Sequence, residues 1–274
     1  MLDSNVSQSV IDHALSLGAD FAELYVERNQ VNNVNTLSSQ VQSVQSGIDF
    51  GIGIRMVYGT KVLYGYTNKT DAAELKRIAT ELAARDLRDP VTAASAFDYR
   101  EISENHPASN ILSIDSQVSE KVAYLLAADK SARAASNMIS QTRGFCMQRE
   151  QSIELFNSEG LHASDVRNYI RAGLTAIASE GGEQATGSWN DGGLSGWEIR
   201  EAMDPEKTGN EATRQALVNL SAKPCPSGRM PVVIGPGFGG VIFHEACGHL
   251  LETTSVAKKA SVFHDQMGAL IANP

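Results

Sequence analysis

The sequence predicts an α+β fold in which helices pack on antiparallel sheets. Three observations support this prediction. Segments with alternating apolar residues follow one another in groups, helical segments stand before and after these groups, and no regular strand–helix–strand alternation develops. The chain has 274 residues, of which 42% are hydrophobic and 20% charged, and this is the composition of a globular protein. Its length suggests about two domains.

Each element of the first predicted region, residues 1–105, follows from its residue pattern. Apolar residues three and four apart indicate helices, while strict alternation indicates strands with one buried face. Asp71 followed by Glu74 resembles a capping box at the start of a helix. The predicted elements are a helix over 5–17, a half-buried strand over 21–28, a weak polar strand over 29–46, a hairpin of strands 48–56 and 62–66, and a helix over 71–87.

The second predicted region, residues 106–274, follows a connector over 88–112 that is rich in small polar residues. We interpret its Gly-rich loop, which carries Trp189, Asn190 and Asp191, either as a lid or substrate contact or as a simple connector. The predicted elements are a helix over 116–137, strands over 139–149, 152–156 and 165–179, the loop over 181–196, a helix over 205–220, a buried strand over 229–234, a tight turn over 235–240 and a helix over 241–252.

Charge and composition exclude several functional classes. The formal net charge of -9 does not suit a nucleic-acid binder or a protein that docks on anionic membranes. No run of about 18 apolar residues predicts a membrane span, and the first residues lack the pattern of a secretory signal, so we expect a cytoplasmic protein. Cys146, Cys225 and Cys247 are too few and too far apart for a disulfide framework or a CxxC metal site.

The chemistry of the chain is concentrated in His244, Glu245 and His249, which form a His-Glu-x-x-x-His pattern in the last predicted helix. In a regular α-helix, positions i and i+4 share a face, whereas i and i+5 point about 140° apart. Two imidazoles with this spacing can reach one metal ion only if a π-bulge absorbs the extra residue. Gly248, a weak helix former, stands where this distortion is needed.

Other interpretations of these residues remain open. The histidines can be ordinary members of an amphipathic helix, although a buried His-Glu pair needs partners, which a metal supplies. Cys247 is either a small buried residue or a substitute ligand at i+3 from His244, and His162 and His264 are isolated. The glycine-rich turn over 235–240 is interpreted as close strand–helix packing rather than a phosphate cradle, since it lacks the GxGxxG spacing.

The segment from Pro224 to Glu252, with the downstream Lys259–Phe263 and Met267-Gly268, resembles the TldD branch of the TldD/PmbA metalloproteases. The early Gly51–Arg55 hairpin and Tyr64–Tyr66 resemble this branch as well, so that the similarity covers essentially the whole chain. The resemblance implies a zinc-dependent peptidase. In this reading His244 and His249 are zinc ligands and Glu245 is the general base.

The resemblance also implies partners and a missing ligand. The family acts on small or unstructured peptides, bound in an extended conformation between sheet and metal helix, and it pairs a metal-bearing subunit with a paralogue, so that we expect a heterodimer or a homodimer. The family's third zinc ligand is a cysteine farther downstream than Pro274, so we expect a truncated, inactive N-terminal portion that binds zinc weakly. The alternatives are a non-catalytic subunit or scaffold and, against the net charge, a nucleic-acid binder.

Overall fold

The computed structural model describes residues 2–86, 88–90, 93–102, 112, 115–236 and 239–271. The chain divides into two compact units: unit 1 contains residues 1–58 and 62–223, and unit 2 contains residues 59–61 and 224–274. The predicted boundary between residues 105 and 106 lies outside the described residues, and unit 1 extends on both sides of it. The α+β class is confirmed.

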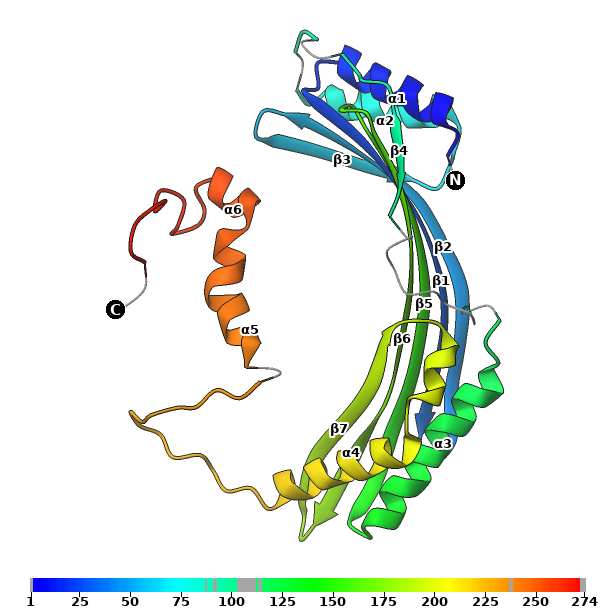
Figure 1. The fold of residues 1–274 in the computed structure, drawn as a ribbon, viewed down its shortest axis with the longest axis vertical. Helices are drawn as coiled ribbons and strands as arrows, with labels where there is room; N and C mark the ends of the chain where they lie inside the picture. The colour runs from blue at the N-terminus through cyan, green and yellow to red at the C-terminus, as the bar shows by residue number, and fades with distance from the viewer. Residues whose placement is uncertain are drawn as a thin grey trace. The chain divides into compact units, whose positions relative to one another are not determined.

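Unit 1 is built on one seven-stranded sheet in which the strands of both predicted regions join (Figure 1). The strand order is β3-β2-β1-β5-β6-β4, and β7 also pairs with β6. The pairs β1–β2, β1–β5, β5–β6 and β6–β7 are antiparallel, whereas the short β4 runs parallel to β6. The strands are β1 Phe21–Leu37, β2 Gln40–Tyr58, β3 Lys61–Thr67, β4 Asp98–Glu101, β5 Ile139–Asn157, β6 Leu161–Glu180 and β7 Glu183–Leu194.

Two pairs of helices cover the same face of this sheet. Ala22, Leu24 and Val26 of β1 are buried in an apolar cluster with α1 and α2, and Val34 is buried in a second cluster with α3. These residues are an even number of positions apart, so their side chains lie on one face of the strand. The helices of unit 1 are α1 Ser4–Ser16, α2 Ala72–Ala83, α3 Val118–Ala135, the short η2 Trp197–Glu201 and α4 Pro205–Leu220.

Local sequence signals set several helix boundaries. The Asp71 carboxylate accepts a hydrogen bond from the Glu74 backbone N–H at the start of α2, as the capping pattern predicted. Asp204 caps α4 in the same way, and Pro205 occupies its first turn, where the missing N–H costs nothing. The predicted helix over 205–220 is confirmed at both ends.

The strands are longer than predicted. The polar stretch assigned to a weak strand completes β1, turns at Ser38 and Ser39, and begins β2. The segments 139–149 and 152–156 form one strand, β5, because the polar residues between them pair with β1 throughout. Tertiary pairing thus overrides weak local propensity at these positions.

Three predictions are wrong. The loop over 181–196 is the strand β7, which turns from β6 at Gly181 and Gly182, both with positive φ. The connector contains β4. The strand over 229–234 does not form: Val232 and Val233 are 74% and 96% exposed, since no described strand lies beside them to bury that run.

A lysine is buried within the second cluster. Lys121 of α3 has no exposed surface, its Nζ donates a hydrogen bond to Asn32 Oδ1 at 2.7 Å, and it faces the Trp197 ring at 5.8 Å. Burial lowers the pKa of this ammonium to about 8. Keeping Lys121 protonated in the folded protein therefore costs free energy that the neutral amine would not cost.

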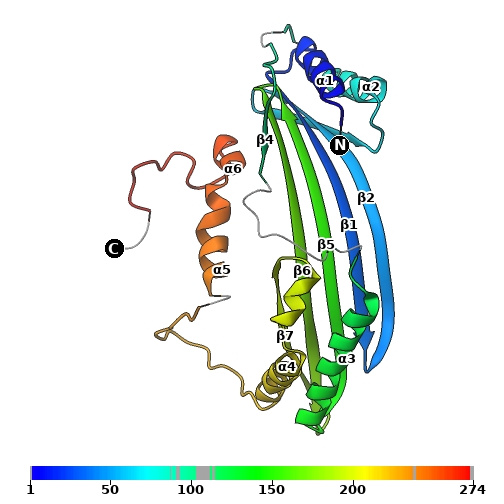
Figure 2. The same cartoon turned by 45° about the vertical axis from the view of Figure 1, so that its right-hand side comes forward.

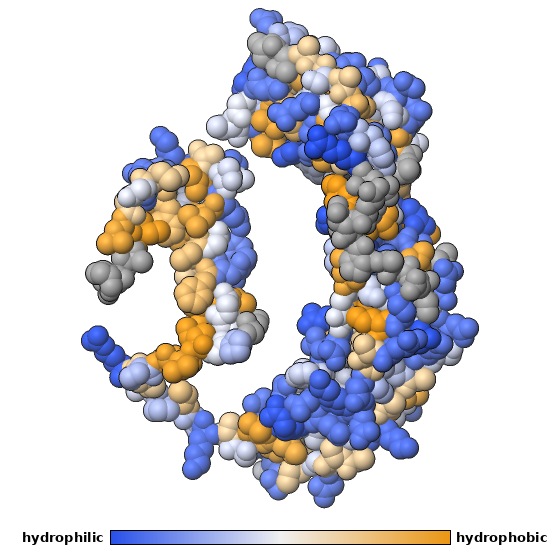
Figure 3. Space-filling model, viewed as in Figure 1, coloured by the Kyte–Doolittle hydropathy of each residue, from blue (hydrophilic) through white to orange (hydrophobic). Residues whose placement is uncertain are grey.

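Unit 2 lacks an apolar core of this kind among its described residues. Its helical elements are α5 Gly240–Phe243, η3 His244–Gly248, η4 His249–Leu251 and α6 Thr253–Ala257. Hydrophobic residues gather on its surface (Figure 3), and Met267 and Leu270 are 100% and 82% exposed. Among the residues described, no helix is both long and apolar enough to cross a bilayer.

Candidate metal centre

The helix that carries the motif is distorted where the spacing of its histidines required it. His244–Gly248 forms a π-helix between the α-turn α5 and the 3₁₀ turn η4. The His249 N–H donates to the His244 carbonyl, five residues back, which is the π pattern. The extra residue is absorbed in this turn, and the predicted bulge is confirmed.

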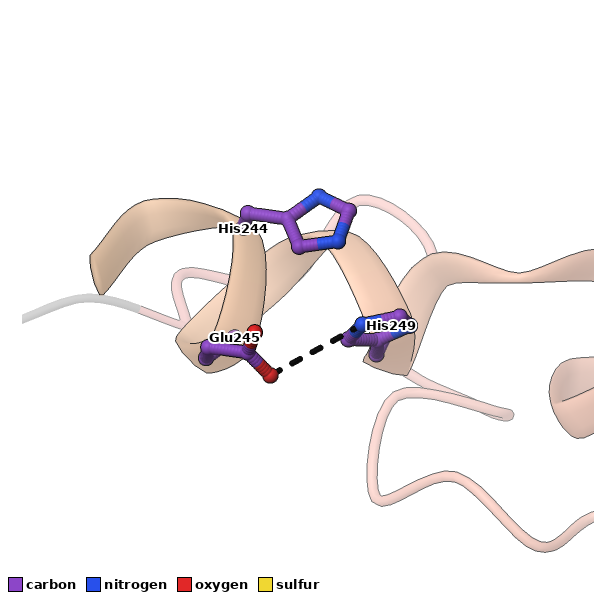
Figure 4. A group of neighbouring side chains, drawn as sticks. All are labelled: His244, Glu245 and His249. Atoms are coloured by element: carbon purple, nitrogen blue, oxygen red, sulfur yellow. Dashed lines mark ion pairs between the residues drawn. The ribbon is translucent and has the colours of Figure 1, made fainter. Parts of the chain in front are cut away.

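The distortion brings the two imidazoles together. The ring centroids of His244 and His249 lie 4.4 Å apart at an interplanar angle of 68°. Glu245 joins them (Figure 4), with 3.7 Å between its Oε2 and His249 Nε2. One possible ligand atom from each of the three residues lies within 4.8 Å of the others. All three side chains are exposed, so an ion can enter from solvent.

Glu252, which the sequence analysis missed, orients His249. Its Oε1 lies 2.6 Å from His249 Nδ1. This hydrogen bond raises the pKa of His249 above its ordinary value of 6.5. In the neutral ring it also favours the tautomer that carries its proton on Nδ1 and leaves Nε2 free to bind a metal. The i, i+3 spacing of His249 and Glu252 was the signal that could have identified this residue.

Gly248 lies directly against the first imidazole. A Cβ atom at this position would stand 3.3 Å from His244 Nδ1. Any larger residue would therefore press on the ring. The turn before the helix is tight as well, because a Cβ at Gly239 would collide with the Gly235 carbonyl oxygen. Gly237 and Phe238, within that predicted turn, lie outside the described residues.

The other candidate ligands stand apart from this group. Cys247 is exposed, and the described ligand group does not include it. Burial raises the pKa of the Cys146 thiol to about 12, which disfavours the thiolate that binds metals. His162 Nε2 lies 2.9 Å from Glu154 Oε1, and the His162 ring stacks on the ring of Phe156. His264 Nδ1 lies 3.0 Å from the Ser261 carbonyl oxygen.

Two cavities are lined by residues that the sequence analysis singled out. An open cavity of about 550 Å³ in unit 2 is lined by Glu245 and by apolar residues such as Val241 and Ile242. A cavity of about 630 Å³ in unit 1 is lined in part by Asn190 and Asp191, which the sequence analysis placed in a loop interpreted either as a lid or substrate contact or as a simple connector. They lie on β7, and Asn190 Oδ1 accepts a hydrogen bond from Arg171 Nε at 2.8 Å.

The donor set fits a zinc ion in type. Imidazole nitrogens and carboxylate oxygens are ligands that zinc takes, and catalytic zinc sites hold three protein ligands and a water. Two convergent histidines beside a carboxylate could provide two ligands and a base, and they would leave the third ligand position to another group.

Comparison with known proteins relates most of the chain to one family of metallopeptidases. Models described as PmbA/TldA metallopeptidase domain 1, central domain and C-terminal domain match residues 22–85, 112–220 and 227–274. A Metalloprotease TldD homolog from Haemophilus influenzae is 29% identical over 100% of this chain and 58% of its own length. A Zinc metalloprotease TldD homolog from Saccharolobus solfataricus is 24% identical over 88% of this chain and 52% of its own length.

Solved structures share the fold. A candidate modulator of DNA gyrase from Bacteroides thetaiotaomicron superposes with a TM-score of 0.75 at 15% identity, over 100% of this chain and 63% of that one. TldE from Thermococcus kodakarensis gives 0.67 at 14% identity, over 95% and 58%. The chain spans only about half the length of the curated relatives named here, 58% and 52%. With three successive domain models matched in order, the chain belongs to the TldD/PmbA family of metallopeptidases.

Proposed function

We propose that this chain is the metal-bearing, TldD-type part of a zinc-dependent peptidase that cleaves small or unstructured peptides in extended conformation. The observation that carries the proposal is the π turn, which makes His244 and His249 converge beside Glu245. The naming of relatives as metalloproteases, and of one as a zinc metalloprotease, supports the same reaction class. A cytoplasmic location and a paralogous or identical partner subunit belong to the proposal.

Each residue of the site has a role in this proposal. His244 and His249 would hold the ion, and a cysteine outside the present sequence would be the third ligand. Zinc bound there would lower the pKa of a bound water and polarise the scissile carbonyl. The Glu245 carboxylate would accept a proton from the attacking water and deliver it to the leaving amine. Glu252 would hold the His249 ring in place through Nδ1.

Substrate selection in this proposal relies on few side chains. The cavity beside Glu245 is open and mostly apolar, so it offers one hydrophobic contact rather than a charged specificity pocket. An extended peptide gains affinity from main-chain hydrogen bonds, which are insensitive to its sequence. We therefore expect broad specificity for unfolded peptides and no cleavage within folded domains.

The test uses the longest reading frame that contains this sequence. Glu245→Gln is expected to abolish hydrolysis of an unstructured peptide while zinc content, measured by elemental analysis, stays near that of the wild type. His244→Ala is expected to lose both peptide hydrolysis and bound zinc. Wild-type cleavage by the Glu245→Gln protein, or stoichiometric zinc in the His244→Ala protein, would contradict the assigned roles.

The alternative is a non-catalytic subunit that only supports an active partner. His244, Glu245 and His249 are all exposed, and no further His, Cys, Asp or Glu among the described residues joins their group, which is the observation that favours it. Zinc binding without any peptide cleavage by the purified protein and its partner would support this alternative.

A further inference from the structure

The cavity of about 630 Å³ in unit 1, which we name the sheet cavity, lies on the face of the sheet opposite to the helices. It is lined mainly by two cross-strand rows of β1, β5 and β6, which are neighbours in the sheet (Figure 2). The rows are Val31, Arg149 and Tyr169, and next to them Asn33, Met147 and Arg171. All six occupy odd positions, whereas Val34 and Cys146, buried under α3, occupy even ones, so these two sets lie on opposite faces.

Glycines keep both rows accessible from the side. The first row continues on β2 with Gly47, where a Cβ would meet nothing within 4 Å, and the second row continues on β7 with Gly192. Neither residue has a side chain that would fill the cavity. Tyr169 and Met147 are 39% and 46% exposed, so apolar surface is available to a ligand. The volume lies in the range of small-molecule sites.

Arg171 is a charged group of the sheet cavity without a counter-ion in the described part of the chain. Arg149, in the neighbouring row, already pairs with Glu27 at 3.1 Å and donates to Asn29 Oδ1 at 2.7 Å. Arg171 donates from Nε to Asn190 Oδ1 at 2.8 Å. Within the described residues its two Nη nitrogens form no hydrogen bond or ion pair. These nitrogens are therefore free to pair with the two oxygens of a carboxylate.

The amide beside Arg171 offers a further donor. Because Asn190 Oδ1 accepts from Arg171, the Nδ2 of the same amide is left to donate to a ligand. Asp191 also lines the cavity, but it pairs with Ala172, which is buried in the second cluster, so its carboxylate lies on the face that the helices cover. An unpaired cation, an amide donor and apolar surface thus meet in one cavity, and together they select an anion attached to an apolar group.

We infer that the sheet cavity binds the C-terminal residue of a peptide, with the terminal carboxylate on Arg171 and an apolar side chain against Met147 and Tyr169. The choice of a peptide as the ligand rests on the proposed function. A carboxylate is planar, as the guanidinium is, so the two can form a pair of parallel N–H···O bonds. Every linear peptide has one such terminus, so the site would favour free chain ends without narrowing the broad specificity expected above.

The experiment measures peptide binding to the full 274-residue chain by fluorescence polarisation, in EDTA so that no zinc is present and no peptide is cleaved. The probe is a pentapeptide of four alanines and a C-terminal leucine, labelled at its N-terminus. It is compared with the same peptide ending in a carboxamide. The wild type is expected to bind the free acid at least about 10-fold more tightly, which is the effect of hydrogen bonds to a charged group.

Two variants locate this preference. Arg171→Gln is expected to bind the acid and the amide within about 2-fold of each other, because it has no charge to pair with the carboxylate. Arg143→Gln is the matched control. Arg143 is exposed on the same face of β5 and has no ion pair among the described residues, but it does not line the sheet cavity. This control is expected to keep the wild-type preference, although it removes the same charge.

Several results would overturn the inference. These are equal binding of acid and amide by the wild type, an unchanged preference in Arg171→Gln, or loss of the preference in Arg143→Gln. An amidated peptide with glutamate in place of one alanine that binds as tightly as the free acid would also overturn it, because the site would then recognise acidic side chains. If circular dichroism shows that Arg171→Gln is unfolded, Arg171→Lys replaces it. Lysine keeps the charge but lacks the planar fork, so its preference is expected to fall to about 3-fold, and an undiminished preference would refute the paired contact.

The same measurements separate this inference from the proposed function. Binding in EDTA does not depend on the metal centre. If the longest reading frame with zinc cleaves no peptide while this chain prefers the free acid, the proposed function fails and the sheet cavity remains a carboxylate site. If the longer protein cleaves peptides while this chain shows no preference for the free acid, the proposed function stands and this inference is refuted.

Discussion

The contact between Gly248 and His244 allows a direct test of the proposed metal centre. In Gly248→Ala, the new Cβ would stand 3.3 Å from His244 Nδ1, closer than the ordinary contact range. The ring must then move by a few tenths of an ångström. Zinc–nitrogen bonds tolerate about 0.2 Å. A shift of this size is comparable with the tolerance, and perturbing a ligand's support typically costs about 10-fold in metal affinity, or about 1.4 kcal/mol.

Alanine has a second effect in the same direction. It favours the regular α-helix by about 1 kcal/mol over glycine. A π turn that reverted to α-helix would place His244 and His249 about 140° apart around the axis and separate the rings. The expected loss of affinity is therefore at least 10-fold.

The assay is calorimetric titration with zinc at protein concentrations high enough to detect weak binding. Gly240→Ala is the matched control, because it makes the same substitution in the same helix at a position where a Cβ meets nothing within 4 Å. It is expected to bind zinc like the wild type. Equal affinities for the two variants would refute the assignment of the π turn as the support of the site.

Three further perturbations have expected outcomes. Lys121→Met removes a buried ammonium whose pKa is lowered to about 8, so the folded wild type binds fewer protons than the unfolded chain above pH 8. From pH 7 to 9 the unfolding free energy of the wild type should rise by about 1 kcal/mol relative to that of Lys121→Met. Urea titrations of the two proteins that gave the same pH dependence would contradict this prediction. Gly209→Ala drives a Cβ into the α3 backbone and should cost about 1–3 kcal/mol in a urea titration. Glu252→Gln should weaken zinc binding by roughly 10-fold through His249, and unchanged affinity would count against that role.

Local chemistry explains which parts of the fold the sequence could predict. The caps at Asp71 and Asp204 involve residues within three positions of one another, so they can be read directly from the chain. The bulge in the helix that carries the motif was predictable for the same reason, since His244 and His249 can converge only if the turn between them is distorted. In each case the residues that determine the local structure are neighbours in the sequence.

Predictions failed where distant partners decide the structure. β7 has the glycine content of a loop, but Gly187 is required where α4 approaches the strand, and Gly181 and Gly182 form its turn. The run 229–234 has the composition of a buried strand, yet burial depends on a neighbour that the described residues do not provide. Glu252 was missed because a glutamate at the end of a predicted helix is usually solvated; its i, i+3 spacing from His249 was a weak signal, which the 2.6 Å contact makes specific.

The order of strands in the sheet also affects how the protein is made. β1 pairs with β5, and Tyr25 of β1 lies opposite Leu155 of β5. Leu155 is synthesised 130 residues after Tyr25, so this pairing cannot form until then. At about 5–20 residues per second, that delay is about 6 to 26 s. Throughout it the nascent β1–β2 hairpin has no third long strand beside it, and this makes early translation the period in which a holding chaperone would have the most to protect.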